Sequence, residues 1–241
     1  MNLVFDFGNT YQKMAVMSLG EVIVFVKKSK IGKRDIELFF KKYNPSQAIL
    51  SSVIDKTEAI EDFVKNKIPF LKFSNKTPIP IENEYKSPQT LGADRLACAV
   101  AAQSLFLGQP VLVIQMGTCI TSDFITKSGI YKGGSISPGL QMRLNSFNHF
   151  SAKLPLVKYK NTEQITGTTT EESILVGVIR GIEDECIGII NRYINAFDNL
   201  KIILTGGDAK LFENRIKNEI FAIDNLVLIG LNIILNYNAE N

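Results

Sequence analysis

A strand that ends in a glycine turn and restarts as a second strand occurs twice in this chain. The first copy is LVFDFGNTYQKMAV, with its turn at Gly8, and the second is VLVIQMGTCITSDF, with its turn at Gly117. Each copy opens a block of short strands that continues into alternating strands and helices, the alternation that builds an α/β layer. The repeat favours a duplicated fold with halves at 1–108 and 109–241, the final helix being free to pack back on the first half. Two unrelated hairpins would give the same pattern, because Gly-Thr turns are common.

Turn residues and apolar runs predict the other elements. In the first half we expect strands over Leu3–Phe7, up to Met17, over Glu21–Lys28, over Ala48–Val53 and near Phe70, and helices over Lys33–Lys42, Lys56–Asn66 and from Arg95 on. In the second half we expect strands over Val111–Met116, Cys119–Thr126, Ile130–Lys132 and Lys201–Leu204, a loop over Gly133–Gly139, helices over Thr170–Tyr193 and Leu211–Asn218, and a last strand over Leu226–Ile229 before a terminal helix.

Composition narrows the class of protein. The 241 residues carry a net charge of +3 with dispersed lysines, which argues against a nucleic-acid partner. The three cysteines show no CxxC spacing, which is typical of reduced thiols rather than of disulfides, zinc or a Cys-His pair. No basic leader precedes the first strand, and the apolar run Leu226–Leu235 is about half the length that a bilayer requires. We therefore expect a soluble, cytoplasmic protein without a membrane partner.

The two glycine turns are candidate phosphate sites. Backbone N–H groups of a tight turn form a small anion-binding nest, and a threonine hydroxyl can donate to the same anion. Asp6, just before the first turn, could hold Mg²⁺ beside phosphates, whereas Asp and Gly are also the ordinary residues of hairpin turns. Gly206-Gly207, after a third strand, allow the backbone to lie flat against a purine or ribose, or simply make a strand-to-helix turn.

The segment LGADRLACAV suggests chemistry at the start of a helix. The negative charge of Asp94 in the first turn interacts favourably with the helix dipole. The positive charge of Arg95 interacts unfavourably with it, so the dipole does not explain an arginine at this position. An adjacent acid and arginine could accept a hydroxyl proton and clamp an anionic substrate. Thr170, which precedes two glutamates, fits the pattern of a helix N-cap. We expect the single histidine, His149, to have a structural role.

Taken together, the motifs resemble the type III pantothenate kinases over essentially the whole chain. The similar segments, in the family's order, are Asp6-x-Gly8-Asn9-Thr10, Tyr85-x-x-Pro88-x-x-x-Gly92-x-Asp94-Arg95, Gly117-Thr118-x-x-Thr121-x-Asp123, Gly133-Gly134-x-Ile136-x-Pro138-Gly139, Lys153-Leu154-Pro155 and Thr170. The resemblance implies an α/β fold of two duplicated actin-like (ribonuclease H-like) domains, each a mixed sheet flanked by helices, with ATP in a central cleft. It also implies transfer of phosphate from ATP to pantothenate, the first step of coenzyme A synthesis, by a cytoplasmic homodimer that uses Mg²⁺.

The resemblance further implies roles for individual residues. Asp94 is the expected proton acceptor for the substrate hydroxyl. The expected ATP contacts are Asp6, Phe7, Gly8, Asn9, Thr10, Tyr11, Gln12, Lys13 and Thr118, and the expected pantothenate contacts are Tyr85, Gly92, Ala93, Asp94, Arg95 and Thr170. Positioning and charge neutralisation do most of the work in such a phosphoryl transfer.

Gln115 departs from the family pattern. The family has aspartate at this position, where its carboxylate is the expected ligand of a monovalent cation, K⁺ or NH₄⁺. An amide oxygen can still coordinate a cation but brings no negative charge. We therefore expect the dependence on this cation to be weakened or lost.

Two other functions fit parts of the pattern. One is another small-molecule kinase of the same superfamily, against which the segment from Tyr85 to Arg95 argues because it selects the acceptor. The other is a catalytically silent regulatory or nucleotide-binding relative, since some relatives of the family were described as transcriptional accessory factors. Gln115 favours the silent relative, whereas Asp6, Asp94 and Arg95 favour an active enzyme.

Overall fold

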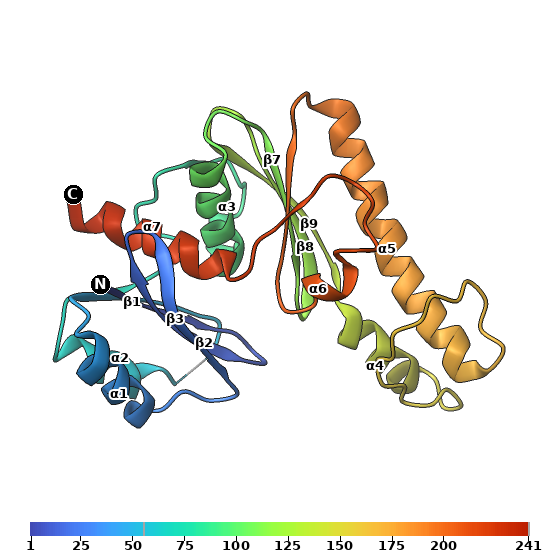
Figure 1. Ribbon diagram of the computed structural model, residues 1–241, viewed down its shortest axis with the longest axis horizontal. Helices are drawn as coiled ribbons and strands as arrows, with labels where there is room; N and C mark the ends of the chain where they lie inside the picture. Colours follow the sequence, from blue (N-terminus) through green and yellow to red (C-terminus); the bar gives the residue numbers. More distant parts are fainter. Residues whose placement is uncertain (55, 241) are drawn as a thin grey trace. The chain divides into compact units, whose positions relative to one another are not determined.

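The chain forms two compact units in a computed structural model that describes residues 1–54 and 56–240 (Figure 1). Unit 1 comprises Met1–Leu107, Gly129–Tyr131 and Asn225–Asn241, and unit 2 comprises Gly108–Ser128 and Lys132–Asp224. The elements before residue 108 are β1 (Asn2–Phe7), β2 (Gln12–Ser18), β3 (Glu21–Lys28), α1 (Lys33–Tyr43), β4 (Gln47–Ser52), α2 (Glu58–Lys65), β5 (Phe70–Lys72), β6 (Glu82–Asn83), the 3-10 helix η1 (Pro88–Thr90) and α3 (Ala93–Leu105). Those after it are β7 (Val111–Met116), β8 (Cys119–Ile125), β9 (Ile130–Pro138), α4 (Leu140–Phe150), α5 (Thr170–Ala196), β10 (Lys201–Thr205), α6 (Ala209–Phe212), β11 (Phe221–Ala222) and α7 (Leu226–Glu240).

The two sheets repeat one topology. The first has the strand order β3-β2-β1-β4-β5, and the second has β9-β8-β7-β10-β11 with β6 added beside β9. In both, the first strand of the block pairs antiparallel with the next one and parallel with the strand on its other side. Asp6 is the second-last residue of β1 and Gln115 is the second-last residue of β7. The predicted duplicated α/β fold is confirmed, and it places Asp6 and Gln115 at equivalent positions.

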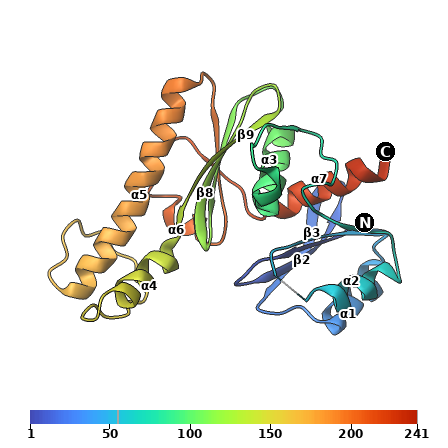
Figure 2. The same ribbon diagram turned by 180° about the vertical axis from the view of Figure 1, so that it is seen from behind.

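Helices cover both faces of the sheet in unit 1. Leu3, Phe5 and Phe7 of β1 are buried in one core with residues of α1 and α2, which lie side by side in Figures 1 and 2. Because side chains alternate along a strand, Val4 and Asp6 point to the opposite face, where α7 contacts β1 and also packs on α3. A strand buried on both faces reads as a continuous apolar run, and Asp6 interrupts that run.

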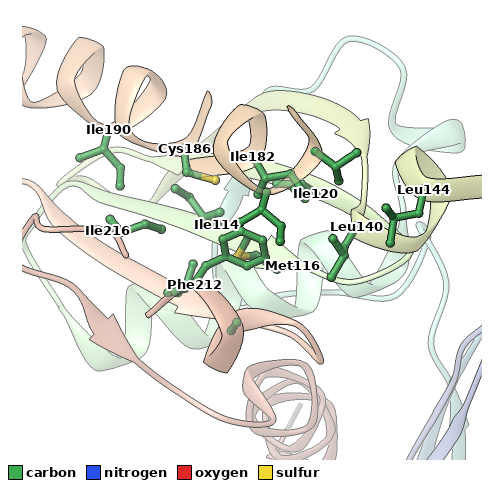
Figure 3. Packing of buried hydrophobic residues seen from close by; sticks show 14 of the residues in the cluster. Ile114, Met116, Ile120, Leu140, Leu144, Ile182, Cys186, Ile190, Phe212 and Ile216 are labelled. Carbon is green, nitrogen blue, oxygen red and sulfur yellow. The ribbon is translucent and has the colours of Figure 1, made fainter. Parts of the chain in front are cut away.

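Unit 2 has one large apolar core between its sheet and α4, α5 and α6. Figure 3 shows Ile114 and Met116 of β7 beneath Ile182 and Cys186 of α5, with Phe212 of α6 beside them. The long helix α5 runs along the sheet in both overall views (Figures 1 and 2). This core fixes the end of β7, from which the second glycine turn leaves.

Three sequence-based assignments are wrong. The expected loop Gly133–Gly139 is mostly part of strand β9. Gly134 lets β9 approach β8 closely, since a Cβ at this position would lie 1.6 Å from the Ser122 carbonyl oxygen. The expected last strand Leu226–Ile229 is the first turn of α7, since a short apolar run fits a buried helix as well as a strand. The helix expected over Leu211–Asn218 is the short α6, Ala209–Phe212.

Candidate functional site

The turn after β1 contains the predicted phosphate-binding residues. The Gly8 N–H donates to the Tyr11 carbonyl oxygen at 3.0 Å, which closes a tight turn. Asn9, Thr10 and Tyr11 are exposed at its tip. An exposed turn of this kind can present backbone N–H groups to an anion, and the phosphate role of this one stays a prediction.

Two side chains of the same stretch have structural partners. Phe7 is 1% exposed and belongs to the core of unit 1. The Gln12 Oε1 accepts a hydrogen bond of 2.5 Å from the Ile31 N–H, which ties β2 to the chain before α1. For Phe7 and Gln12, a contact with a bound phosphate would therefore come from the backbone.

Asp6 is a buried carboxylate in an ion pair. It is 8% exposed, and the Nζ of Lys13, its neighbour across the β1–β2 pair, lies 3.1 Å from its Oδ2. Burial raises the pKa of the Asp6 carboxyl, the Lys13 ammonium opposes this rise, and the Asp94 carboxylate adds to it. Asp6 and Asp94 are thus close enough in unit 1 to interact electrostatically.

Replacing Asp6 with asparagine is expected to stabilise unit 1 at neutral pH. Because the folded-state pKa lies above the ordinary value of 3.8, the unfolded chain releases its proton first as the pH rises. The free energy of unfolding therefore decreases as the pH rises from 3.8 to the raised pKa of Asp6, and the decrease is complete above that pKa. Urea unfolding of wild type and Asp6→Asn at pH 7 and pH 3.5 measures this. The variant should be the more stable protein at pH 7, with the difference shrinking at pH 3.5; equal stability at both pH values would contradict it.

The first turn of α3 brings together four predicted substrate residues. The helix N-cap is Gly92, and a Cβ there would lie 2.7 Å from the Asp94 Oδ1, so the carboxylate lies over the helix start. Arg95 is 4% exposed, and its Cζ lies 5.7 Å from the ring centroid of Tyr85. An aromatic face stabilises a guanidinium group at this distance. Ala93 is the first residue of the helix. The predicted substrate residues of unit 1 therefore lie together at the start of α3, with Tyr85 beside them.

The position of this cluster depends on α7, which sequence reasoning did not identify. A Cβ at Gly230 of α7 would lie 1.8 Å from the Ala97 carbonyl oxygen of α3. The backbones of the two helices therefore touch, and glycine is what permits this approach. The signal in the sequence is a glycine inside the apolar run of the terminal helix.

In unit 2, the Gly117–Thr118 turn is held by two other glycine segments. The Gly139 N–H donates to the Thr118 carbonyl oxygen at 3.0 Å, and a Cβ at Gly139 would lie 2.1 Å from the Gly117 carbonyl oxygen. Gly206 has φ +104°, and a Cβ there would lie 2.1 Å from the Met116 carbonyl oxygen. The side chain of Thr118 is exposed at this turn. The sequence left Gly206 open between a contact with a base or ribose and a strand-to-helix turn, and it did not reveal the contact with the end of β7.

Gln115 lies in a row of polar residues. Its partners on the neighbouring strands are Thr121 of β8 and Thr205 of β10, and residues paired in this way share one face of a sheet. The Thr121 hydroxyl donates to the Asp123 Oδ2 at 3.1 Å, and Asp123 is 0% exposed. The predicted cation position therefore has neutral oxygens nearby and a buried carboxylate further along β8.

Thr170 is the first residue of α5 and not its N-cap. The cap is Thr169, whose hydroxyl accepts from the Glu172 N–H, while the Glu172 carboxylate accepts from the Thr168 N–H and hydroxyl. This reciprocal arrangement resembles a capping box and is shared by two threonines and a glutamate. Thr170 itself is exposed, so its side chain is accessible to a ligand. His149, the structural histidine of the sequence interpretation, is exposed at the end of α4 and touches Phe150.

The described residues contain neither a clustered metal site nor a membrane-spanning helix. Among residues 1–54 and 56–240, no group of three or more His, Cys, Asp or Glu side chains is placed to hold a metal ion. No helix in the described part of the chain has the length and apolar character to cross a bilayer. In the described residues the three cysteines form no disulfide; Cys98 and Cys186 are buried, and Cys119 is half-buried.

Comparison with known proteins gives a consistent result. The family model for type III pantothenate kinase matches residues 2–192. A type III pantothenate kinase from Phocaeicola vulgatus is 42% identical over 242 residues, which cover 100% of this chain and 100% of that protein.

Solved structures share the fold. A Campylobacter jejuni protein described as a Baf family transcriptional activator has a TM-score of 0.61 at 21% identity, covering 99% of this chain and 100% of that chain. A glucokinase from an Antarctic psychrotroph has a TM-score of 0.51 at 11% identity, covering 98% of each chain. At these identities the likeness concerns the fold alone. It confirms the predicted actin-like fold.

Proposed function

Since this chain belongs to the type III pantothenate kinase family, we propose that it transfers the γ-phosphoryl group of ATP to the primary hydroxyl of pantothenate, with Asp94 as the proton acceptor. The products are ADP and 4′-phosphopantothenate, the first intermediate of coenzyme A synthesis. The observation that supports Asp94 in this role is its place in unit 1. It stands at the half-buried start of α3, beside Gly92 and Arg95 and within electrostatic range of Asp6.

We assign the substrate contacts by unit. In unit 1 the turn from Asp6 to Lys13 binds the ATP phosphates, and Tyr85 with Gly92–Arg95 binds pantothenate. In unit 2 Thr118 donates to the phosphates and Thr170 contacts pantothenate. Asp94 takes the proton of the pantothenate hydroxyl. The hydroxyl oxygen then bonds to the γ-phosphorus while the bond from that phosphorus to ADP breaks and ADP leaves. Arg95, fixed against Tyr85, offsets the negative charge that develops.

Asp6 suits a role beside Mg²⁺. Magnesium prefers carboxylate oxygens and phosphates and keeps several waters, so one or two acids are enough. Asp6 would be one such acid. Its pKa is raised by burial and by the nearby Asp94 carboxylate, a rise that a bound cation would oppose. When bound, Mg²⁺ neutralises phosphate charge. The protein's part is to hold the carboxylate in place, which Lys13 does from β2.

At the monovalent-cation position, the neutral Gln115 should make the activity independent of K⁺ or NH₄⁺. We expect wild-type activity to differ by less than about twofold between K⁺ and choline buffers, because ligand charge sets much of a site's cation affinity. Gln115→Asp should become activated by about tenfold. Kinase assays across a K⁺ titration measure both. Strong K⁺ activation of wild type, or a Gln115→Asp variant with unchanged activity in all buffers, would contradict the proposal.

We further propose that the enzyme acts as a homodimer in the cytoplasm, where ATP is available.

The proposed division of the duplicated fold is 1–108 and 109–241. Its support is the repeated strand order, in which β1 and β7 have equivalent neighbours.

The function is tested by incubating the purified protein with ATP, Mg²⁺ and an acceptor, and following ADP release and the phosphorylated product. Pantothenate should be the preferred acceptor in a panel that includes glucose, N-acetylmannosamine and acetate. Preference for a sugar or for acetate would favour another kinase of the superfamily. ATP binding without turnover on any acceptor would favour the silent relative.

A further inference from the structure

The segment Ser137–Gly139, between β9 and α4, is fastened to α5 by a polar network. Arg143 of α4 donates from its Nε to the Pro138 carbonyl oxygen at 2.7 Å and pairs through its Nη2 with the Glu185 carboxylate. The Ser137 hydroxyl donates to the other oxygen of Glu185 at 2.5 Å. Both carboxylate oxygens are thus used, and the charge-assisted bonds are of the stronger kind.

The same segment lies directly against the phosphate turn of unit 2. Gly139 donates its N–H to the Thr118 carbonyl oxygen at 3.0 Å, and the Gly139 carbonyl oxygen accepts from the Arg143 N–H at 2.9 Å. Because a Cβ at Gly139 would lie 2.1 Å from the Gly117 carbonyl oxygen, the two backbones are in contact. A shift of residues 137–139 would therefore move the turn or break its hydrogen bond.

The other end of the network is anchored beside the core of unit 2. Glu185 lies on α5 between Ile182 and Cys186, which are 0% and 1% exposed in the core of unit 2. Figure 3 shows these two residues above Ile114 and Met116, at the end of the strand that leads into the turn. Leu140 and Leu144 attach α4 to the same core. The Arg143–Glu185 pair adds a polar connection to this apolar anchorage.

We propose that Arg143 and Glu185 are positioning residues that hold the Gly117–Thr118 turn, through Ser137–Gly139, in the conformation that binds the ATP phosphates. The inference rests on the proposed function, because it takes Thr118 as an ATP contact. The side chains of Arg143 and Glu185 are 20% and 27% exposed, and an ion pair at that exposure contributes little to global stability. Its effect should therefore appear in ATP binding more than in unfolding.

The test is a double-mutant cycle of Arg143→Ala, Glu185→Ala and the combined variant. Each single variant should raise KM for ATP, and Kd for a non-hydrolysable ATP analogue, about tenfold, the effect of one lost charge-assisted hydrogen bond. KM for pantothenate should stay within about twofold. The double variant should resemble the singles, because the two residues act as one unit. Glu185→Gln, which keeps an acceptor oxygen for Ser137 or Arg143, should recover part of the affinity.

Ile190→Val is the matched control, since it trims the same core from the same helix without touching the pair; it should leave both KM values unchanged. Unchanged ATP affinity in Arg143→Ala and Glu185→Ala, or an equal rise of both KM values, would overturn the inference. If an alanine variant does not fold, Arg143→Lys and Glu185→Gln replace it, with a smaller rise confined to ATP expected. Binding of the analogue distinguishes the two proposals. If wild type binds the analogue but does not phosphorylate pantothenate, only the proposed function is refuted.

Discussion

Asp94→Asn is expected to lower kcat for pantothenate phosphorylation about a thousandfold. An amide of nearly the same shape cannot take the proton of the attacking hydroxyl, and general-base catalysis typically contributes two to four orders of magnitude. Asp94 is half-buried beside Gly92 at the start of α3, and because asparagine has nearly the same shape, the substitution removes the charge with little repacking. Steady-state kinetics of product formation, with binding of an ATP analogue measured in parallel, gives both quantities.

Glu58→Gln provides the control for this variant. Glu58 is an acid in the first turn of α2, also in unit 1, and it is exposed. Each substitution removes a favourable charge–dipole interaction worth about 0.3–1 kcal/mol. Only Asp94→Asn should lose turnover, while both variants should bind the analogue like wild type. A kcat for Asp94→Asn within tenfold of wild type would exclude Asp94 as the proton acceptor.

Gly230→Ala is expected to destabilise unit 1 by about 3 kcal/mol, the upper part of the usual range for overpacking. The added methyl group would lie 1.8 Å from the Ala97 carbonyl oxygen, so α7 and α3 must separate. Since α3 carries Asp94 and Arg95, the kinase activity should fall as well. Urea unfolding followed by circular dichroism measures the stability, and the same preparation serves for the activity assay.

Gly177→Ala is the counterpart of that variant in a second helix. Gly177 is an exposed residue of α5, and a Cβ there meets nothing within 4 Å. Removing a helical glycine at an open position should stabilise the protein by about 0.5–1 kcal/mol. Opposite signs for the two substitutions are the expected result. Stabilisation by Gly230→Ala would show that the contact between α7 and α3 tolerates a methyl group.

Much of the fold could be predicted because local signals agreed with the final packing. β1 and β7 are β-branched and apolar runs that end in glycine turns, and the start of α3 follows Gly92. The errors arose where one pattern serves two structures. The apolar run Leu226–Ile229 suits a buried strand and also a helix that is buried on most sides. Gly134 suits a turn and also a close contact between strands.

Residues of the candidate site could be proposed from the sequence, whereas the contacts that hold them could not. Asp94 and Arg95 were proposed from their type and place, and the structure puts Arg95 over the ring of Tyr85. The contact of Gly139 with the Gly117–Thr118 turn depends on a long-range packing of backbones, which spacing along the chain does not reveal. The same holds for the interaction of Asp6 with Asp94, since α7 fixes α3 in unit 1.

The membership of α7 in unit 1 sets an order for folding during synthesis. Residues 1–107 leave the ribosome long before Asn225, so the nascent first unit has an α3 whose Ala97 backbone still lacks its glycine partner. Unit 2 can complete its own sheet and α5 in that interval. The helix that carries Asp94, the proposed proton acceptor, therefore gains its contact with α7 only after residues 225–240 have been synthesised, and a nascent chain that lacks them has an α3 without this support.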